Sequence, residues 1–246
     1  MNPSAWPYPR WIAHRGAGKL APENTLAAFR LGAAHGYRMF ECDVKLSQDG
    51  IPFLMHDADL RRTTNGSGIG GDTSWHALSQ LDAGSWHSRS FAGETLPSLD
   101  NIAIYCLRNR HHLNIEIKPS PGTERHTGEV VARRAAALWP ATDVPPLLTS
   151  FDIEALEGAQ HTAPELPRGL LLDKPRADWL DIARRLECVA VVCNYALWDV
   201  STVAAAQAVG LRCLSYTVND EWIAERLIAL GTDGIITDRV ELFSPA

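Results

Sequence analysis

Short apolar segments alternate with amphipathic, alanine-rich segments along nearly the whole chain, and this alternation restricts the fold more than any other feature. Eight of the apolar segments read as strands buried on both faces. They span residues 11–16, 39–46, 112–118, 146–151, 169–173, 189–194, 212–218 and 234–237. Helical segments follow most of them, at residues 24–35, 99–109, 127–139, 153–162, 177–186, 200–209 and 221–230. Eight strands with helical connections predict a closed α/β structure, the (β/α)8 or TIM barrel.

An open, doubly wound parallel sheet produces a similar alternation and is the alternative fold. No Gly-x-Gly-x-x-Gly sequence follows the first strand convincingly, which weakens the dinucleotide-binding form of that alternative. The chain has 246 residues, and α/β barrels commonly run about 250 residues as one domain. We therefore expect a single domain, residues 1–246.

One region interrupts the alternation after the second predicted strand. Residues 51–57 read as an additional strand, paired with its predecessor across the turn Gln48-Asp49-Gly50. Residues 58–96 contain several glycines and few helix signals, and they are too long for an ordinary connection. We expect a small insertion over the C-terminal face of the barrel, which could shape substrate access or serve stability alone.

The net charge and the cysteine content restrict the partners and the cellular compartment that we expect. A net charge of -6 argues against a general nucleic-acid surface. The five cysteines are odd in number and scattered, as expected of small buried residues in a reducing compartment. Residues 1–10 lack the apolar core of a signal peptide, and no apolar run approaches the ~18 residues of a membrane span. We expect a cytoplasmic protein.

Acidic residues recur at alternate positions near the ends of two predicted strands, where a barrel keeps its active site. Glu41 and Asp43 share one face of a strand, roughly 6.6 Å apart, and Glu116 and Lys118 repeat this spacing on the next barrel strand. Buried carboxylates side by side repel one another unless a cation compensates them. Three carboxylates without histidine or thiolate partners suit Mg²⁺, Ca²⁺ or Mn²⁺. Alternatively, two ion pairs, Glu41–Arg15 and Glu116–Lys118, would balance these charges without a metal.

Two histidines, His14 and His56, also lie at predicted strand ends. A single such histidine is often structural, but two beside carboxylates and an arginine favour a pair that exchanges protons near neutral pH. Arg15 offers a fork suited to phosphate oxygens, and Lys118 could bind a phosphoryl oxygen or neutralise a carboxylate. Asp57 could orient His56, complete the shell of a cation or hydrogen-bond to the local backbone.

The last two predicted strands end in polar residues as well. Asn219 follows the seventh strand and could cap the next helix. Asp238 follows the eighth strand, and spacing alone gives it no role.

Taken in order, these residues resemble the glycerophosphodiester phosphodiesterase family. The resemblance covers about residues 11 to 240, and its ordered set of motifs is highly specific. The matching stretches are His14-Arg15-Gly16, Pro22-Glu23-Asn24-Thr25, Glu41-x-Asp43, His56-Asp57, Arg62-Thr63-Thr64-Asn65-Gly66, Leu96-Pro97-Ser98-Leu99, Glu116-x-Lys118, Ser150-Phe151, Thr217-Val218-Asn219 and residues 231–238. The chain is similar to the short cytosolic bacterial members.

The resemblance implies a TIM barrel with a small insertion after the second strand and one divalent cation held by Glu41, Asp43 and Glu116. It implies His14 and His56 as general acid and base, with Arg15 and Lys118 on the phosphate. The family often has tryptophan where this chain has Tyr216, a residue we therefore expect to contact the substrate and to affect pocket size or headgroup contacts.

The reaction that the resemblance implies is hydrolysis of a glycerophosphodiester to sn-glycerol 3-phosphate and an alcohol. The nucleophile would be either the glycerol 2-hydroxyl, through a cyclic phosphate that water then opens, or water directly. Two other functions compete: a related barrel lyase that releases the cyclic phosphate, and a barrel that binds glycerophosphodiesters without turnover. The expected partner is a small-molecule substrate. No pattern in the sequence indicates the headgroup, the particular cation or the oligomeric state.

Overall fold

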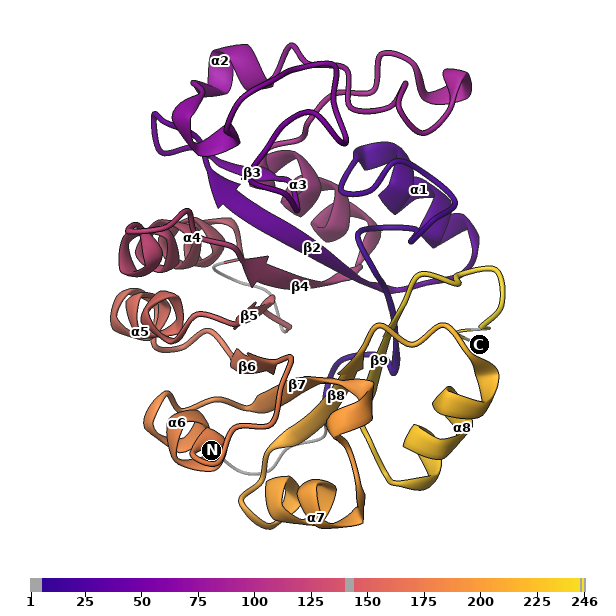
Figure 1. The fold of residues 1–246 in the computed structure, drawn as a ribbon, viewed down its shortest axis with the longest axis vertical. Helices are drawn as coiled ribbons and strands as arrows, with labels where there is room; N and C mark the ends of the chain where they lie inside the picture. The colour runs from indigo at the N-terminus through magenta and orange to yellow at the C-terminus, as the bar shows by residue number, and fades with distance from the viewer. Residues whose placement is uncertain (1–5, 140–143, 244, 246) are drawn as a thin grey trace.

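The fold is a closed barrel of eight parallel strands (Figure 1), seen in a computed structural model that describes residues 6–139, 144–243 and 245. Around the barrel the strands follow the order β1, β9, β8, β7, β6, β5, β4 and β2, and β2 pairs with β1 to close it. Their bounds are β1 (Trp11–Ala13), β2 (Met39–Leu46), β4 (His112–Ile117), β5 (Leu147–Ser150), β6 (Arg168–Leu172), β7 (Ala190–Asn194), β8 (Arg212–Tyr216) and β9 (Gly234–Thr237).

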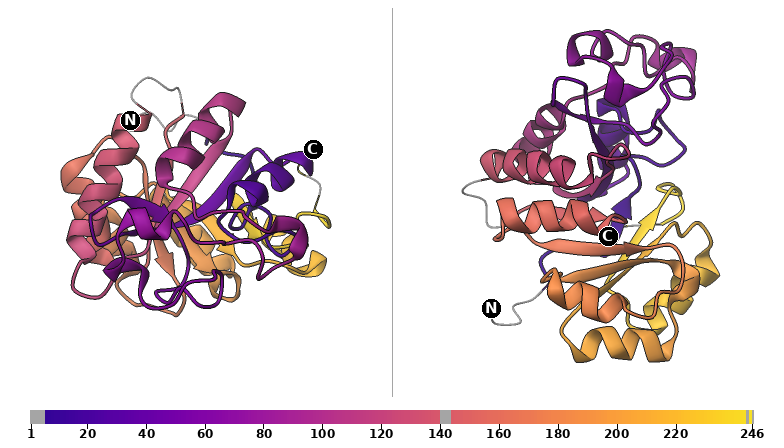
Figure 2. Two further views of the ribbon diagram at one scale, coloured as in Figure 1. Left: turned by 90° about the horizontal axis from the view of Figure 1, so that it is seen from above. Right: turned by 60° about the vertical axis from the view of Figure 1, so that its left-hand side comes forward.

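Helices surround the strands as an outer layer (Figure 2). They are α1 (Leu26–Ala34), α3 (Leu99–Asn109), α4 (Glu124–Leu138), α5 (Ile153–Thr162), α6 (Trp179–Arg185), α7 (Val200–Ala208) and α8 (Glu221–Ala229). Side-chain caps fix several of their starts: Ser98 forms a capping box with Asn101, and Asp152 accepts two backbone amides at the start of α5. No helix in the described part of the chain has the length and apolarity needed to cross a bilayer.

Strand alternation separates the interior of the barrel from the helix layer. On β2, Phe40, Cys42 and Val44 are fully buried in a cluster that includes residues of α1 and α3. The alternate positions Glu41 and Asp43 therefore face the barrel interior. The apolar core of the interior is a separate cluster, which includes Ile12, Met39, Leu147, Leu171, Val192, Leu214 and Ile236.

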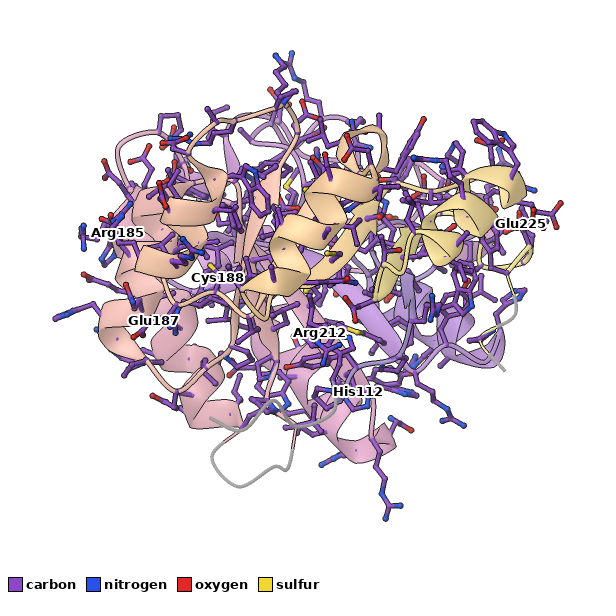
Figure 3. All side chains as sticks on the ribbon, turned by 90° about the horizontal axis from the view of Figure 1, so that it is seen from below. His112, Arg185, Glu187, Cys188, Arg212 and Glu225 are labelled. Atoms are coloured by element: carbon purple, nitrogen blue, oxygen red, sulfur yellow. The ribbon has the colours of Figure 1, made fainter. Side chains whose placement is uncertain are left out.

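The two ends of the barrel differ in chemistry. His112, Cys188 and Arg212, labelled in Figure 3, lie at or just before the starts of β4, β7 and β8. They mark the amino-terminal end of the barrel. The acidic residues of β2 and β4 lie toward the carboxyl ends of their strands, at the opposite mouth, where (β/α)8 enzymes place their active sites.

A segment of loops and short helices follows β3 (Pro52–Leu54), which pairs antiparallel with β2. It contains η1 (Gly70–Asp72), α2 (Trp75–Leu78) and η2 (Arg89–Phe91). Its own small hydrophobic cluster consists of Phe53, Met55, Leu60, Leu78, Ala83 and Leu96. Figures 1 and 2 show this segment at one end of the longest axis, beside β2, α1 and α3. It therefore borders one side of the barrel mouth instead of covering the whole face.

The predicted barrel is confirmed, and the pairing of β1 with β2 excludes an open sheet. The predicted bounds of β2, β9, α3 and α5 agree with the structure. β1 ends at Ala13, three residues before the predicted end, because Arg15 and Gly16 adopt positive φ angles of 51° and 98° that turn the chain out of the strand.

Candidate active site

Three carboxylates converge at the carboxyl end of the barrel on two adjacent strands. Glu41 and Asp43 come from β2 and Glu116 from β4, and one oxygen of each lies within 4.8 Å of the others. The parallel register pairs Asp43 directly with Glu116. Glu41 and Asp43 are only 3% and 1% exposed. The structure thus brings the predicted trio into one buried cluster.

The two nearest cations balance this cluster unevenly. Arg15 Nε lies 3.2 Å and Lys118 Nζ 3.6 Å from the oxygens of Asp43, and Lys118 also donates to Glu116 at 3.0 Å. Burial would raise the pKa of Asp43, but the two cations outweigh it and hold that pKa at about 2. Burial and then the charge of Asp43 raise the pKa of Glu41 to about 8. Glu41 is therefore the less compensated of the two charges on β2.

The cluster fits a hard divalent cation. Oε1 of Glu41 is buried and has no hydrogen-bond partner within residues 6–139, 144–243 and 245. Converging carboxylate oxygens without sulfur or imidazole are the donors that Mg²⁺, Ca²⁺ and Mn²⁺ prefer. An ion bound here would pair with the orphaned oxygen and remove the repulsion that raises the pKa of Glu41.

The metal-free alternative of two ion pairs holds for one pair and fails for the other. Lys118 does pair with Glu116. The guanidinium of Arg15, however, lies against Asp43 and donates from Nη1 to Glu23 at 2.9 Å. What Arg15 gives Glu41 is its backbone amide, at 3.0 Å. The Glu41–Arg15 ion pair of this alternative does not form, because the turn after β1 directs the side chain of Arg15 to Asp43 and Glu23.

The loop between β1 and α1 is held in an unusual backbone conformation. Arg15 and Asn24 both have positive φ, 51° and 60°, a left-handed region that asparagine tolerates better than arginine. Asn24 exchanges two hydrogen bonds with Asp43, donating from Nδ2 at 2.8 Å and accepting the Asp43 amide at 3.1 Å. A Cβ on Gly18 would lie 2.1 Å from the carbonyl oxygen of Asp238, so only glycine allows the loop to pack there. The sequence thus fixes Arg15 close to the cluster.

His14 is anchored by a carboxylate from the opposite end of the chain. Its Nδ1 lies 2.6 Å from Oδ1 of Asp238, just after β9, and its Nε2 lies 3.8 Å from Glu41. Asn219 donates to the second oxygen of Asp238 at 3.0 Å and accepts the Asp238 amide at 2.9 Å. Burial alone would lower the pKa of His14, but the hydrogen bond to Asp238 and the nearby negative charges of Glu41 and Asp238 together outweigh it and raise that pKa. Nε2 is left as the nitrogen that faces the cluster.

His56, in the loop after β3, is anchored in a similar way by a different carboxylate. Its Nδ1 lies 2.8 Å from Oδ1 of the adjacent Asp57, whose other oxygen accepts from Nε of Arg62 at 2.5 Å. Burial lowers the pKa of His56, and the nearby charge of Arg15 lowers it further. Asp57 thus orients His56, the first of the three roles that the sequence left open for it.

A cavity of about 170 Å³ lies between these groups. The side chains that line it come from seven of the barrel strands or the loops that follow them, and from the loop after β3. They include His14, Arg15, Glu41, His56, Asn114, Glu116, Lys118, Thr149, Phe151, Leu171, Tyr216 and Ile236. Two histidines, two cations and two carboxylates of the predicted set therefore face one space, while Asp43 lies behind it.

Aromatic rings form the opposite side of this cavity. Tyr216 and Phe151 meet edge to face with ring centroids 5.7 Å apart, and the Tyr216 hydroxyl donates to the carbonyl oxygen of Leu172 at 3.1 Å. A larger cavity of about 660 Å³ lies between the loops after β6 and β7, and no predicted site residue lines it. The predicted catalytic and phosphate-binding residues thus lie around the smaller cavity.

Sequence reasoning missed two pairs of supporting residues. The sequence assigns Asp238 no role and allows Asn219 to cap the next helix; the structure shows that Asp220 precedes α8 and that Asn219 donates to Asp238 instead. Glu23 and Arg62 were noted as motif residues without a function. The one feature of the sequence that could have indicated a function for them is that both are charged residues within the matching stretches.

The fold and the site together define a barrel enzyme of the phosphodiesterase class. Residues 14–242 match the model of the "Glycerophosphoryl diester phosphodiesterase family", and the chain belongs to this family. The predicted family and enzyme class are therefore confirmed.

Individual relatives agree over almost their whole length. A glycerophosphodiester phosphodiesterase of Caldanaerobacter subterraneus subsp. tengcongensis is 32% identical over 234 residues, covering 94% of both chains. The structure of an Oleispira antarctica phosphodiesterase, in complex with the product sn-glycerol-3-phosphate, superposes with a TM-score of 0.89 at 36% identity, covering 94% of this chain and 93% of that one. A glycerophosphodiester phosphodiesterase structure from Agrobacterium tumefaciens str. C58 follows at 28% identity and a TM-score of 0.78, covering 97% of this chain and all of that one.

Proposed function

We propose that this protein hydrolyses glycerophosphodiesters to sn-glycerol 3-phosphate and an alcohol, with the help of one divalent cation and two histidines. The observation that carries the proposal is the arrangement around the small cavity. Two imidazoles, each anchored at Nδ1 by a carboxylate, face it together with two cations and an incompletely compensated acidic cluster. The product bound to the Oleispira antarctica relative is the molecule that this reaction would release.

Glu41, Asp43 and Glu116 would hold the cation. Mg²⁺ or Ca²⁺ suits their hard oxygens best, and Mn²⁺ is also compatible. When bound, such an ion withdraws charge from phosphoryl oxygens and so stabilises the transition state of phosphoryl transfer. The orphaned Oε1 of Glu41 and the repulsion among the buried carboxylates support this assignment.

Arg15 and Lys118 would bind the phosphate. Both side chains line the cavity and both already lie against Asp43. Their charges would offset the negative charge of the phosphodiester and the charge that grows on its oxygens during the reaction. Lys118 carries three donors, and Glu116 accepts one of them at 3.0 Å.

His14 and His56 would move the protons. Because Nδ1 of each ring is engaged by Asp238 or Asp57, Nε2 is the nitrogen available for exchange with the substrate. One histidine would remove the proton from the nucleophile, and the other would protonate the departing alkoxide. The rings come from different segments that both line the cavity, His14 from the end of β1 and His56 from the loop after β3.

Tyr216 and Phe151 would contact the organic part of the substrate. A cavity of about 170 Å³ is below the usual size of pockets that bury a drug-sized ligand, which start at about 300 Å³. We infer that it encloses the glycerophosphate portion and that the alcohol extends toward the mouth, past the rim formed by these rings. Tyr216 would then influence which headgroups fit.

The proposal also covers the organisation and location of the chain. We propose one domain, residues 1–246, in which residues 58–96 form an insertion beside the barrel mouth. The small cluster around Phe53 and Leu78 gives that insertion its own packing. The five cysteines are free, and all but Cys188 are buried, which supports a reducing, cytoplasmic location.

A panel of glycerophosphodiesters tests the proposal. Glycerophosphocholine, glycerophosphoethanolamine and glycerophosphoglycerol would be incubated with the purified protein, and the products identified by phosphorus NMR. The proposal predicts sn-glycerol 3-phosphate as the final phosphorus-containing product. A cyclic phosphate that accumulates without further conversion would indicate a lyase, and an unchanged panel would indicate a binding protein; either result contradicts the proposal.

A further inference from the structure

One guanidinium group links the two loops that carry Arg15 and His56. Arg62 lies in the loop after β3, and its Nε donates to Asp57 at 2.5 Å. Its Nη1 and Nη2 donate to the two oxygens of Glu23, in the loop before α1, at 2.8 and 2.7 Å. These bonds join segments 39 residues apart in sequence. Arg62 thus uses three of its nitrogens to connect two carboxylates from different loops.

Each of these carboxylates also binds a residue that faces the cavity. Asp57 accepts from Nδ1 of His56 at 2.8 Å, and Glu23 accepts from Nη1 of Arg15 at 2.9 Å. A continuous chain of charge-assisted hydrogen bonds therefore runs from Arg15 through Glu23, Arg62 and Asp57 to His56. Both ends of this chain line the cavity, and its middle does not.

The exposure and the hydrogen-bond geometry of Arg62 indicate that it positions other residues more than it stabilises the fold. The side chain of Arg62 is 45% exposed, and exposed ion pairs contribute little to folding free energy. A two-pronged arginine–carboxylate contact, however, fixes direction as well as distance. Through Glu23, Arg62 contacts the loop between β1 and α1. This loop contains Arg15 and Asn24 in left-handed conformations, which persist only where surrounding contacts hold them. The paired hydrogen bonds from Arg62 to Glu23 provide such a contact.

We propose that Arg62 is a positioning residue, which sets the separation and orientation of Arg15 and His56 through Glu23 and Asp57. This inference rests on the proposed function of those two residues. The stretch around Glu23 and the stretch that begins at Arg62 have no part in the proposed reaction steps. Positioning of Arg15 and His56 gives both stretches a role. Arg62 would act without touching the substrate.

Arg61 provides a matched control for the test. It is the neighbouring residue, it is 74% exposed, and it pairs with Asp59 alone among the described residues. Arg62→Met and Arg61→Met therefore remove the same charge from the same loop. We expect Arg62→Met to lose about 10- to 100-fold in kcat/KM, the range measured for partners that orient functional ligands, and Arg61→Met to stay within about 2-fold of wild type.

Two further measurements separate positioning from damage to the fold. Arg62→Met should melt within a few degrees of Arg61→Met, and Arg62→Lys, which keeps the charge but not the fork, should fall between wild type and Arg62→Met in activity. Added guanidinium ions should restore part of the activity of Arg62→Met and none of that of His56→Ala. Equal activity of the Arg62→Met and Arg61→Met variants would overturn the proposal.

An NMR measurement tests the inference independently of catalysis. The Nδ1 proton of His56, held against Asp57, gives a downfield resonance that is assigned by its loss in His56→Ala. We expect this resonance to persist in Arg61→Met and to broaden or vanish in Arg62→Met, because Asp57 loses its second anchor. An unchanged resonance in Arg62→Met would refute the positioning role, whether or not any glycerophosphodiester is a substrate. Wild-type protein that is inactive but shows the expected NMR change in Arg62→Met would refute only the proposed function.

Discussion

Replacing Asp238 by asparagine should slow hydrolysis about 10- to 100-fold without unfolding the protein. Asp238 lies 2.6 Å from Nδ1 of His14, with side-chain exposures of 17% and 16%, so little water can substitute for the lost carboxylate. Hydrogen bonds to charged groups contribute about 1.5–3 kcal/mol, and each 1.36 kcal/mol in the transition state is tenfold in rate. The asparagine keeps the size of the side chain and its contact with Asn219.

The assay is steady-state kinetics on one glycerophosphodiester, with thermal melting measured in parallel. Asp220→Asn is the matched control, because Asp220 precedes α8 on the same face, is exposed and makes no side-chain cap hydrogen bond. We expect the loss to appear mainly in kcat, since His14 acts in the chemical step. A kcat within about 2-fold of the Asp220→Asn control would refute the assignment of Asp238 as the partner of a catalytic His14.

The same variant should shift the pH dependence in a defined direction. In the wild type, the hydrogen bond to Asp238 and the charges of Asp238 and Glu41 together raise the pKa of His14 against the effect of burial. Without that carboxylate burial dominates, so the pKa falls. The limb of the pH–rate profile that reports His14 should move to lower pH, and a move to higher pH would contradict the reasoning.

Four other changes have defined outcomes. His14→Ala and His56→Ala should each lose at least ~100-fold in kcat, the scale of general acid–base catalysis, and near-normal turnover of either variant would remove that residue from the mechanism. A phosphodiester that lacks the hydroxyl group next to the ester should be hydrolysed far more slowly if the glycerol 2-hydroxyl is the nucleophile, so brisk turnover of this compound would show direct attack by water. Tyr216→Ala should raise KM about tenfold with a smaller change in kcat, because loss of an apolar ring contact costs about 1.5 kcal/mol or more, and an unchanged KM across the substrate panel would remove Tyr216 from the binding site.

The parts of the fold that the sequence predicted well are those with a strong local pattern. β2 was placed correctly because seven of its eight residues are buried, and its apolar residues are interrupted only by Glu41, Asp43 and Lys45. α2 was missed because a helix of four residues has no repeating pattern; the Ser74 cap and the burial of Leu78 against Phe53 hold it in place.

The acidic cluster could be predicted because two simple rules determine it. Alternation places Glu41 and Asp43 on one face of β2, and the parallel register places Glu116 beside Asp43. Both rules depend on spacing within short stretches of chain. The sequence therefore contained the carboxylate trio, although it left an ion-pair explanation open.

The supporting carboxylates could not be predicted from spacing. Asp238 and His14 are 224 residues apart, and their contact depends on β1 and β9 being neighbours in the closed barrel. Arg62 reaches Glu23 only because the loop after β3 folds back toward α1. Such contacts follow from tertiary closure, which leaves no periodic signal in the sequence.

Removal and return of the metal test whether Glu41, Asp43 and Glu116 hold a divalent cation that hydrolysis needs. The protein would be treated with EDTA, dialysed and checked for residual metal by elemental analysis. Release of glycerol 3-phosphate would then be measured before and after addition of Mg²⁺, Ca²⁺ or Mn²⁺. The account predicts a loss of at least ~100-fold, recovered with at least one of these ions in the wild type but not in Glu41→Gln. Full activity of verified metal-free protein would contradict it.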